Sequence, residues 1–439
     1  MLCSDCEFTW RPDRAEPRLF ALLACVLAVT TSAVATAAAE VVSIQDTQLD
    51  NGLRLVTRCD PSAATFAIAA AARLSAAEEA AGQEGLRELV ELCLSSTGGE
   101  AASAGVLVEA QTRPDLVTIT ARAPGSLWQA ATDAVIGRAF MAHFDSATIR
   151  AGQRTLGRLA EAQREMPLAV VERAGVEALY PASARHQEPT VARLLLAPAA
   201  LERFYREHFV PNNIILVASG PVDAKALRTK VAAMTAELLP GKATGQRGVV
   251  AAPLRPGTRK LVMDGVDSAV WVGARAPRPG TREYRIAVVA MTLLANGMGS
   301  RLYRRLRDEL SLAYLLGGQV MAGRLWPYMY VSCTCEAEKA GQALAEIEQE
   351  LDRAAREDAA DREIERAREV AATQLLALEM SNWRVVQYLS AVALLSEPPG
   401  RPESPSELAA QVRQVRKDQV REFVRDWWTL RATIQLVGG

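Results

Sequence analysis

Histidines are the first residues to weigh, because a hydrolytic zinc site usually needs at least two of them close together. This chain has three, His143, His186 and His208. No histidine precedes His143, and the other two are far apart from each other in the sequence. We therefore expect His186 and His208 to lie at the surface or in side-chain packing and not to bind a metal.

Three acidic residues, Glu84, Glu88 and Glu91, are spaced so that one face of a helix would carry all of them. Such spacing is most typical of a face exposed to solvent. The alternative is a carboxylate cation site, which would suit Ca²⁺ or Mg²⁺ better than Zn²⁺. The sequence favours the exposed face.

The cysteines are too few for a disulfide framework. Four of the seven follow residue 39, namely Cys59, Cys93, Cys333 and Cys335. The last two alternate in YMYVSCTCEAE, so an extended strand would place both thiols on one face. We interpret them as core residues.

Composition places the chain among ordinary folded proteins. Of its 439 residues, 49% are hydrophobic and 23% are charged, with 50 Lys and Arg against 51 Asp and Glu. This balance argues against disorder and against a nucleic-acid-coating role. The length allows several domains, each large enough to bury a core.

Residues 1–39 have the pattern of a secretory signal. Arginines precede the apolar run of residues 19–29, and small residues end at Ala39. We expect cleavage near Ala39, no membrane span in the mature chain, and a location in a bacterial periplasm or outside the cell. The alternatives are a retained membrane anchor and lipidation at Cys25.

The rest of the chain reads as two halves of similar plan. Gly, Pro and small residues gather at 239–257, between halves of roughly 200 and 180 residues. Each half opens with two strand-like stretches, continues with helical periodicity and closes with another strand. These stretches are LRLVTRCD, ATFAIAAAARL and NIILVASG, then TRKLVMDGV, SAVWVGARA and ATIQLVGG. The repeated order predicts a duplicated α+β unit, with domains at 40–240 and 258–439 and a linker at 241–257.

Helical signals are clearest in the second half. REYRIAVVAMTLLANG predicts a buried helix that ends at Gly297, and Ser300 is placed to cap the helix SRLYRRLRDEL. The long charged stretch after residue 340 has many opposite charges three and four residues apart, which is typical of solvent-facing helices.

Five ordered landmarks together resemble the M16 peptidase family (pitrilysin, insulinase, mitochondrial processing peptidase). They are LDNGLRLV, a helix that begins at Gly85, EALYP, FYREHFVPNNIILVASG and GMGSRLYRRLRDELSLAY. The resemblance implies two homologous α+β halves, each a mixed sheet covered by helices, that close like a clamshell over an extended peptide.

Active members of this family carry His-x-x-Glu-His on the helix that begins at this glycine. Two histidines at i and i+4 bind the metal, and the glutamate between them activates water. Here Glu88 and Leu92 stand at the histidine positions, and Glu91 keeps the general-base position. A third ligand, a glutamate, is expected within GRLAEAQREMP, where the candidates are Leu159, Glu161 and Glu165. Leucine cannot bind a metal, so we expect this chain to bind no zinc.

The second half keeps a different part of the family machinery. Active members supply from it an arginine and a tyrosine that reach the substrate main chain and the oxyanion, and Arg307 and Tyr314 match that pattern in LRDELSLAY. A guanidinium binds a peptide carbonyl well, and a phenol can stabilise developing negative charge. The alternative is that both residues only brace the helix and the strand that follows it.

The resemblance therefore implies a zinc-less subunit of a two-chain peptidase. A partner subunit of the same family would carry zinc, and the pair would cleave peptides with Arg307 and Tyr314 acting in trans. The alternative is a scaffold or peptide-binding protein without catalysis, like the core subunits of the respiratory cytochrome bc1 complex. A free-standing metallopeptidase with unusual ligands is a third possibility, which metal content would distinguish.

Overall fold

The structure, a computed structural model, describes residues 42–80, 82–96, 105–181, 198–242, 257–396 and 400–439. The expected signal at 1–39, His186 and most of the expected linker lie outside the described residues. Within the described ranges, no helix is both long and apolar enough to span a bilayer.

The first sheet contains six strands in the order β1-β2-β6-β3-β5-β4. Strands β2 and β6 run parallel, and the other neighbouring pairs are antiparallel. Strand β3 is buried over nearly its whole length, because both faces of the sheet are covered. This explains why TFAIAAAAR is a continuous apolar run with no alternation. The strands are β1 (Ser43–Gln48), β2 (Arg54–Cys59), β3 (Thr65–Arg73), β4 (Leu107–Arg113), β5 (Leu116–Pro124) and β6 (Ile214–Gly220).

The second sheet repeats this plan without the first edge strand. Its order is β7-β11-β8-β10-β9, with β7 and β11 parallel and the other pairs antiparallel. Each strand takes the place of its counterpart in the order β2-β6-β3-β5-β4, so the predicted duplicated α+β architecture is confirmed. The strands are β7 (Gly257–Met263), β8 (Ser268–Arg275), β9 (Leu316–Met321), β10 (Tyr328–Cys335) and β11 (Arg431–Gly438).

One face of each sheet is covered by helices of the same half. The first core is completed by α2 (Leu86–Ser96), α4 (Trp128–Phe140), α5 (Ser146–Glu165), α7 (Pro198–His208) and α8 (Ala224–Thr235). The second is completed by α9 (Arg282–Leu294), α11 (Ala340–Arg356), α12 (Asp361–Leu376), α14 (Pro405–Val412) and α15 (Lys417–Trp428). Cys333 and Cys335 lie in this second core, as predicted.

Two local predictions in this half need correction. Helices α11 and α12 are not solvent-facing throughout, since each buries one face in the core. Ser300 occupies the position before α10 (Arg301–Tyr303), but its hydroxyl is buried and makes no hydrogen bond to any described residue. The prediction that Ser300 occupies the cap position is therefore confirmed, but the hydrogen bond expected from its side chain is not formed.

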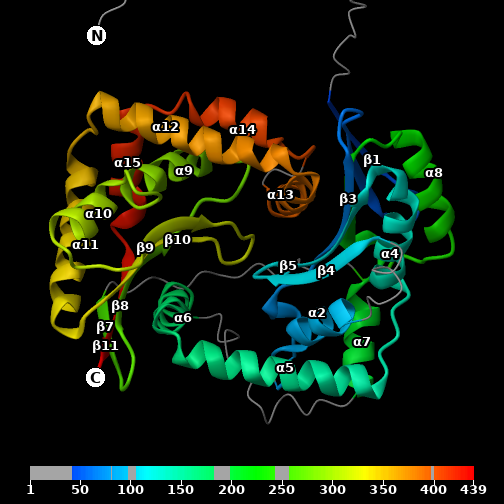
Figure 1. The fold of residues 1–439 in the computed structure, drawn as a ribbon, viewed down its shortest axis with the longest axis horizontal. Coiled ribbons are helices and arrows are strands. Elements are labelled where there is room, and N and C mark those ends of the chain that lie inside the picture. Colours follow the sequence, from blue (N-terminus) through cyan, green and yellow to red (C-terminus); the bar gives the residue numbers. More distant parts are fainter. Residues whose placement is uncertain (1–41, 81, 97–104, 182–197, 243–256, 397–399) are drawn as a thin grey trace, which may run out of the picture. The chain divides into compact units, whose positions relative to one another are not determined.

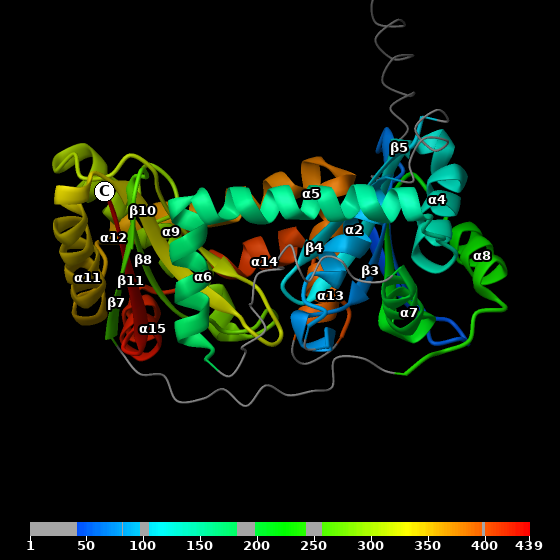
Figure 2. The ribbon, with the colours of Figure 1, turned by 90° about the horizontal axis from the view of Figure 1, so that it is seen from below.

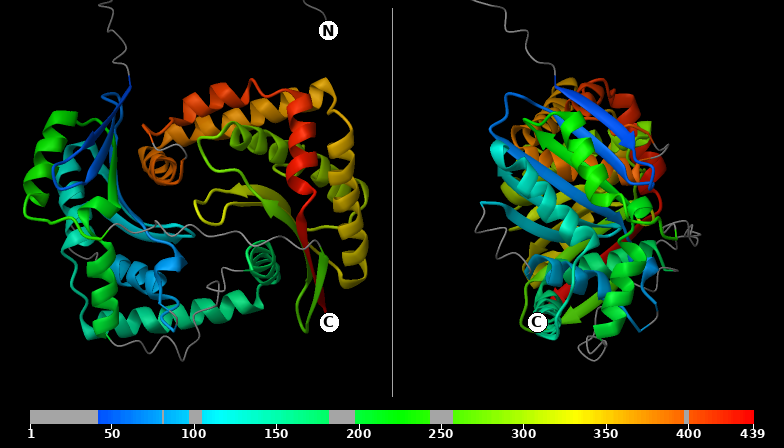
Figure 3. Two further views of the ribbon diagram at one scale, coloured as in Figure 1. Left: turned by 180° about the vertical axis from the view of Figure 1, so that it is seen from behind. Right: turned by 90° about the vertical axis from the view of Figure 1, so that its right-hand side faces the viewer.

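The opposite face of each sheet is covered by a helix from the other half. Helix α6 (Pro167–Leu179), which directly follows α5, packs on β8, β11 and β10 (Figure 2). Helix α13 (Asn382–Leu395) packs on β3, β6 and β5 (Figures 1 and 3). Polar contacts fix both helices. The Arg275 guanidinium donates to the Leu179 carbonyl at 2.8 Å, and the Asn382 amide donates to the Thr65 carbonyl at 2.7 Å.

A substitution at Gly175 of α6 tests how closely this helix packs on the sheet of the other half. A β-carbon at Gly175 would lie 2.4 Å from the ring of the fully buried Trp271 on β8. We expect Gly175→Ala to lower the free energy of unfolding by about 2 kcal/mol, because neither the ring nor the helix can yield without strain. Urea denaturation measures the change.

The matched control is Gly137→Ala in α4, where a β-carbon would meet nothing within 4 Å. That variant should be neutral or more stable by roughly 0.5–1 kcal/mol, as expected for alanine in place of glycine inside a helix. Equal stabilities for the two variants would contradict the close packing of α6 on Trp271.

Candidate functional site

The degenerate zinc-motif segment lines a cavity of about 550 Å³. Helix α2 begins directly after Gly85, whose φ of 97° is a conformation that glycine adopts readily. From this helix Glu88, Glu91 and Leu92 all line the cavity, so the residues at the motif positions face one space that is open to solvent on one side. Trp326 and Tyr328 contribute to the wall from the second half.

The structure also separates the three candidates for the third ligand position. Leu159 of α5 lines the cavity, whereas Glu161 and Glu165 are exposed and do not contribute to its wall. Leucines therefore stand at the second histidine position of the motif and at the one candidate for the third ligand that lines the cavity. Among the described residues, no group of three His, Cys, Asp or Glu side chains could hold a metal ion. The donor set does not fit zinc.

Charge in the cavity is largely compensated locally. The buried Arg87 guanidinium donates to Glu88 at 3.1 Å and lies 3.6 Å from a carboxylate oxygen of Glu79. Burial raises the pKa of Glu79 to about 7. Glu91 accepts a hydrogen bond from the Thr112 backbone at 2.8 Å, and burial raises its pKa as well. The backbone donor of Thr112 therefore fixes the carboxyl group of Glu91 at the wall of the cavity.

The expectation of a fully solvated acidic face on this helix is wrong. Glu84 is buried and accepts a hydrogen bond from the Gly82 backbone at 3.1 Å. Glu88 and Glu91 are partly buried, because the wall of the cavity covers them. The periodicity placed the acids on one face, but it could not show what packs against that face.

The two histidines within the described residues do not contribute to a metal site. His143 is exposed. His208 is buried against the ring of Phe204, with the ring centroids 4.6 Å apart, and burial lowers its pKa. The prediction of a surface or packing role is confirmed for His208.

Arg307 and Tyr314 are brought together by an irregular segment. Residues Arg304–Glu309 form a π-helical turn, and Ser311 adopts a positive φ of 51°. Such distortions are costly and are frequent at functional sites. The Arg307 guanidinium donates to the Tyr314 carbonyl at 3.3 Å and lies over the Tyr303 ring. Both side chains are exposed, Tyr314 at 58%.

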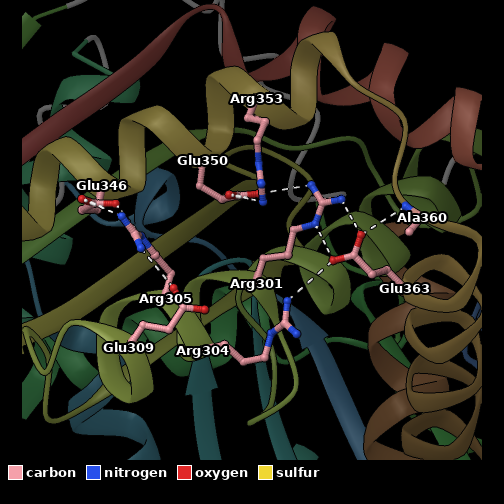
Figure 4. A network of polar contacts seen from close by, with 9 residues as sticks. All are labelled: Arg301, Arg304, Arg305, Glu309, Glu346, Glu350, Arg353, Ala360 and Glu363. Carbon is pink, nitrogen blue, oxygen red and sulfur yellow. Dashed lines mark hydrogen bonds and ion pairs between the residues drawn. The ribbon is translucent and has the colours of Figure 1, made fainter.

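A network of arginine and glutamate side chains anchors the start of this segment (Figure 4). The buried Arg301 guanidinium donates two hydrogen bonds to Glu363 of α12, at 2.7 and 3.0 Å, and one to Glu350 of α11 at 3.1 Å. Arg305 donates to Glu346 of α11 at 2.9 Å. The network therefore ties α10 and the π-helical turn to α11 and α12. Its last arginine, Arg305, is two residues before Arg307.

Arg301→Met is expected to destabilise the chain by about 3 kcal/mol, because it leaves Glu350 and Glu363 without their buried partner. Arg301 also lowers the pKa of Glu363 from its ordinary value of 4.5. A lowered carboxylate pKa contributes stability above that value, and the contribution is lost as pH falls through the folded-state pKa. The difference between the natural chain and the variant should therefore shrink below about pH 4.5. Urea denaturation at several pH values measures it.

The control is Arg416→Met, which removes an exposed arginine paired with Asp418. Its effect should stay below about 1 kcal/mol, because solvent screens such pairs. If the two variants lost similar amounts of free energy of unfolding, the buried network would contribute no more to stability than a surface ion pair does.

One residue of this region could not be found by reading the sequence. The carboxylate of Glu336, which follows β10, accepts a hydrogen bond from the Tyr314 hydroxyl at 2.6 Å. The two residues are 22 positions apart, and the strands β9 and β10 bring them together. No local motif marks such a contact.

The chain is similar in sequence to known peptidase domains. Residues 196–370 match the family described as Peptidase M16 inactive domain. The chain is 25% identical over 250 residues to an uncharacterized zinc protease of Streptomyces coelicolor, and it spans 52% of the length of that relative.

Solved structures of low sequence identity share the fold over most of the chain. A protease from Helicobacter pylori has a TM-score of 0.80 at 14% identity, with 90% of this chain and 99% of that one covered. A peptidase M16 inactive domain from Pseudomonas fluorescens has a TM-score of 0.78 at 13% identity, covering 90% and 98%. A chain of complex III2 from Candida albicans has a TM-score of 0.75 at 16% identity, covering 90% and 96%.

These matches extend across both sheets, and they agree with the landmarks in the sequence. The motif positions of the first half carry Glu88 and Leu92 where zinc ligands would stand. Residues 196–370 therefore match the M16 inactive domain, both halves share the fold of M16-like peptidases, and helix α2 carries no His-x-x-Glu-His motif.

Proposed function

We propose that the chain is the zinc-less subunit of a two-chain M16 peptidase. The observation that carries the proposal is the contrast between its two halves. The first half has Glu88 and Leu92 at the two histidine positions of the motif, and Leu159 lines the same cavity. The second half presents Arg307 and Tyr314 together at the surface.

In the assembled enzyme, zinc held by the partner subunit would supply the Lewis acid and the activated water. This chain would bind and orient the peptide. The Arg307 guanidinium offers donors in a planar fork that suits a main-chain carbonyl. The Tyr314 hydroxyl offers one donor for the oxygen that becomes negative in the tetrahedral state, and such a donor is worth roughly 3–4 kcal/mol.

A scaffold without catalysis is the second candidate. The chain from complex III2 shares the fold at 16% identity, so the architecture by itself does not separate a peptidase subunit from a component of a larger assembly. The exposed Arg307 and Tyr314 favour the peptidase subunit, because a scaffold has no need for a guanidinium and a phenol placed side by side at the surface.

Affinity purification of the chain from its own cells tests the proposal, with every stoichiometric partner identified by mass spectrometry. We expect a partner of similar size that carries His-x-x-Glu-His, together with peptide cleavage by the pair that chelators abolish. Because the leader predicts export, the pair should be recovered from the periplasmic or extracellular fraction. Recovery of the chain alone, or only with respiratory components, would favour the scaffold.

A further inference from the structure

The Tyr314 hydroxyl is already engaged within its own chain. It donates to one carboxylate oxygen of Glu336 at 2.6 Å, and the other oxygen lies 3.0 Å from the Lys339 ammonium. Lys339 in turn donates to the carbonyl of Ser311 at 3.4 Å, on the loop that leads to Tyr314. The phenol is thus held by a short chain of charged contacts.

This contact conflicts with the catalytic role proposed above. A phenol has a single O–H donor. While its proton is shared with the Glu336 carboxylate, the hydroxyl cannot donate to the oxygen of a tetrahedral intermediate. An ionised acceptor also makes the hydrogen bond stronger than a neutral one would be.

The side chain can leave without disturbing the backbone. The Tyr314 backbone N–H donates to the Thr334 carbonyl at 3.0 Å, and the Thr334 N–H donates to the Leu315 carbonyl at 2.9 Å. These bonds hold the main chain of Tyr314 against the end of β10. The ring itself is 58% exposed, so a rotation of the side chain meets little resistance from packing.

We propose that Glu336 holds Tyr314 in a resting position, and that binding of the peptide or of the partner subunit must displace this carboxylate before the phenol can act. Glu336 is then a positioning residue that acts through Tyr314. The inference rests on the proposed function, since only a catalytic Tyr314 has an action to restrain.

The first experiment tests the contact in the isolated chain. Ionisation of Tyr314 is followed by NMR of the chain labelled at the tyrosine ζ-carbon, and Tyr314→Phe identifies its signal among the eight tyrosines. The hydrogen bond to Glu336 and the charge of its carboxylate raise the pKa of Tyr314 above its ordinary value of 10.0, and the Lys339 ammonium opposes this rise. Glu336→Ala should lower this pKa, and Glu338→Ala, an exposed carboxylate on the same turn, should not. An unchanged titration in Glu336→Ala would overturn the proposal.

The second experiment measures cleavage of an internally quenched peptide by the pair recovered from cells. Glu336→Ala should raise kcat/KM roughly threefold or more, because the phenol no longer has to leave a charged acceptor, while Glu338→Ala leaves it unchanged. A fall in Glu336→Ala, with a fall in Tyr314→Phe, would overturn the restraint and leave the split peptidase standing. If Tyr314→Phe has no effect, or if no zinc-bearing partner is recovered, the proposed function fails and this inference fails with it.

Discussion

A variant with Glu88→His, Leu92→His and Leu159→Glu should retain about one zinc ion per chain after dialysis, whereas the natural chain should retain none. Residues 88 and 92 are one helical turn apart on α2, and residue 159 comes from α5, yet all three line the same cavity. The variant therefore gathers two imidazoles and a carboxylate beside Glu91, which keeps the position of the general base. Metal content by plasma mass spectrometry measures the outcome.

A matched control separates the cavity from the mere presence of two histidines. Glu84→His with Glu88→His has the same spacing, but residue 84 does not line the cavity and precedes the start of α2. This control should not retain zinc. If the triple variant also retained no zinc, α2 and α5 would not meet in the geometry of a metal site. If the natural chain retained stoichiometric zinc, it would bind the metal through ligands other than those of the motif.

Local pattern was sufficient to predict the repeated plan of the fold. The stretches at β2, β3 and β6 have the same order as those at β7, β8 and β11, and β-propensity with apolar continuity marks each of them. The loss of the zinc motif could also be read directly, because Glu88 and Leu92 sit at fixed spacing in one helix. Both predictions depend only on residues that are close together in the sequence, within one strand or a few turns of one helix.

Contacts between distant segments could not be predicted in the same way. Helix α6 has an ordinary amphipathic pattern, and nothing in it states that Trp271 of the other half lies beneath it. The burial of Glu350 beside Arg301 joins residues 49 positions apart, in a stretch whose charge pattern is typical of an exposed helix. That Leu159 lines the cavity and Glu161 does not became visible only when α5 was placed beside α2. Tertiary packing decides each of these cases.

The largest effect on activity is expected from Tyr314→Phe in the assembled pair. Loss of one oxyanion donor should lower kcat about 10²- to 10³-fold while KM changes little, because the missing hydrogen bond is made chiefly in the transition state. Assembly should survive, since the ring remains and the Tyr314 hydroxyl contacts only Glu336 among the polar groups of the described residues. Steady-state kinetics and gel filtration of the recovered pair measure the two properties.

Two further variants on the same segment make the assignment specific. Tyr303→Phe keeps the ring beneath Arg307 and removes a different phenol, so kcat should stay near its natural value. Arg307→Lys keeps the charge but loses the planar fork that suits a peptide carbonyl, so KM should rise together with a fall in kcat. If Tyr314→Phe and Tyr303→Phe had equal kinetics, the phenol of Tyr314 would have no part in the transition state, and the exposed pair would serve only to shape the loop that leads to β9.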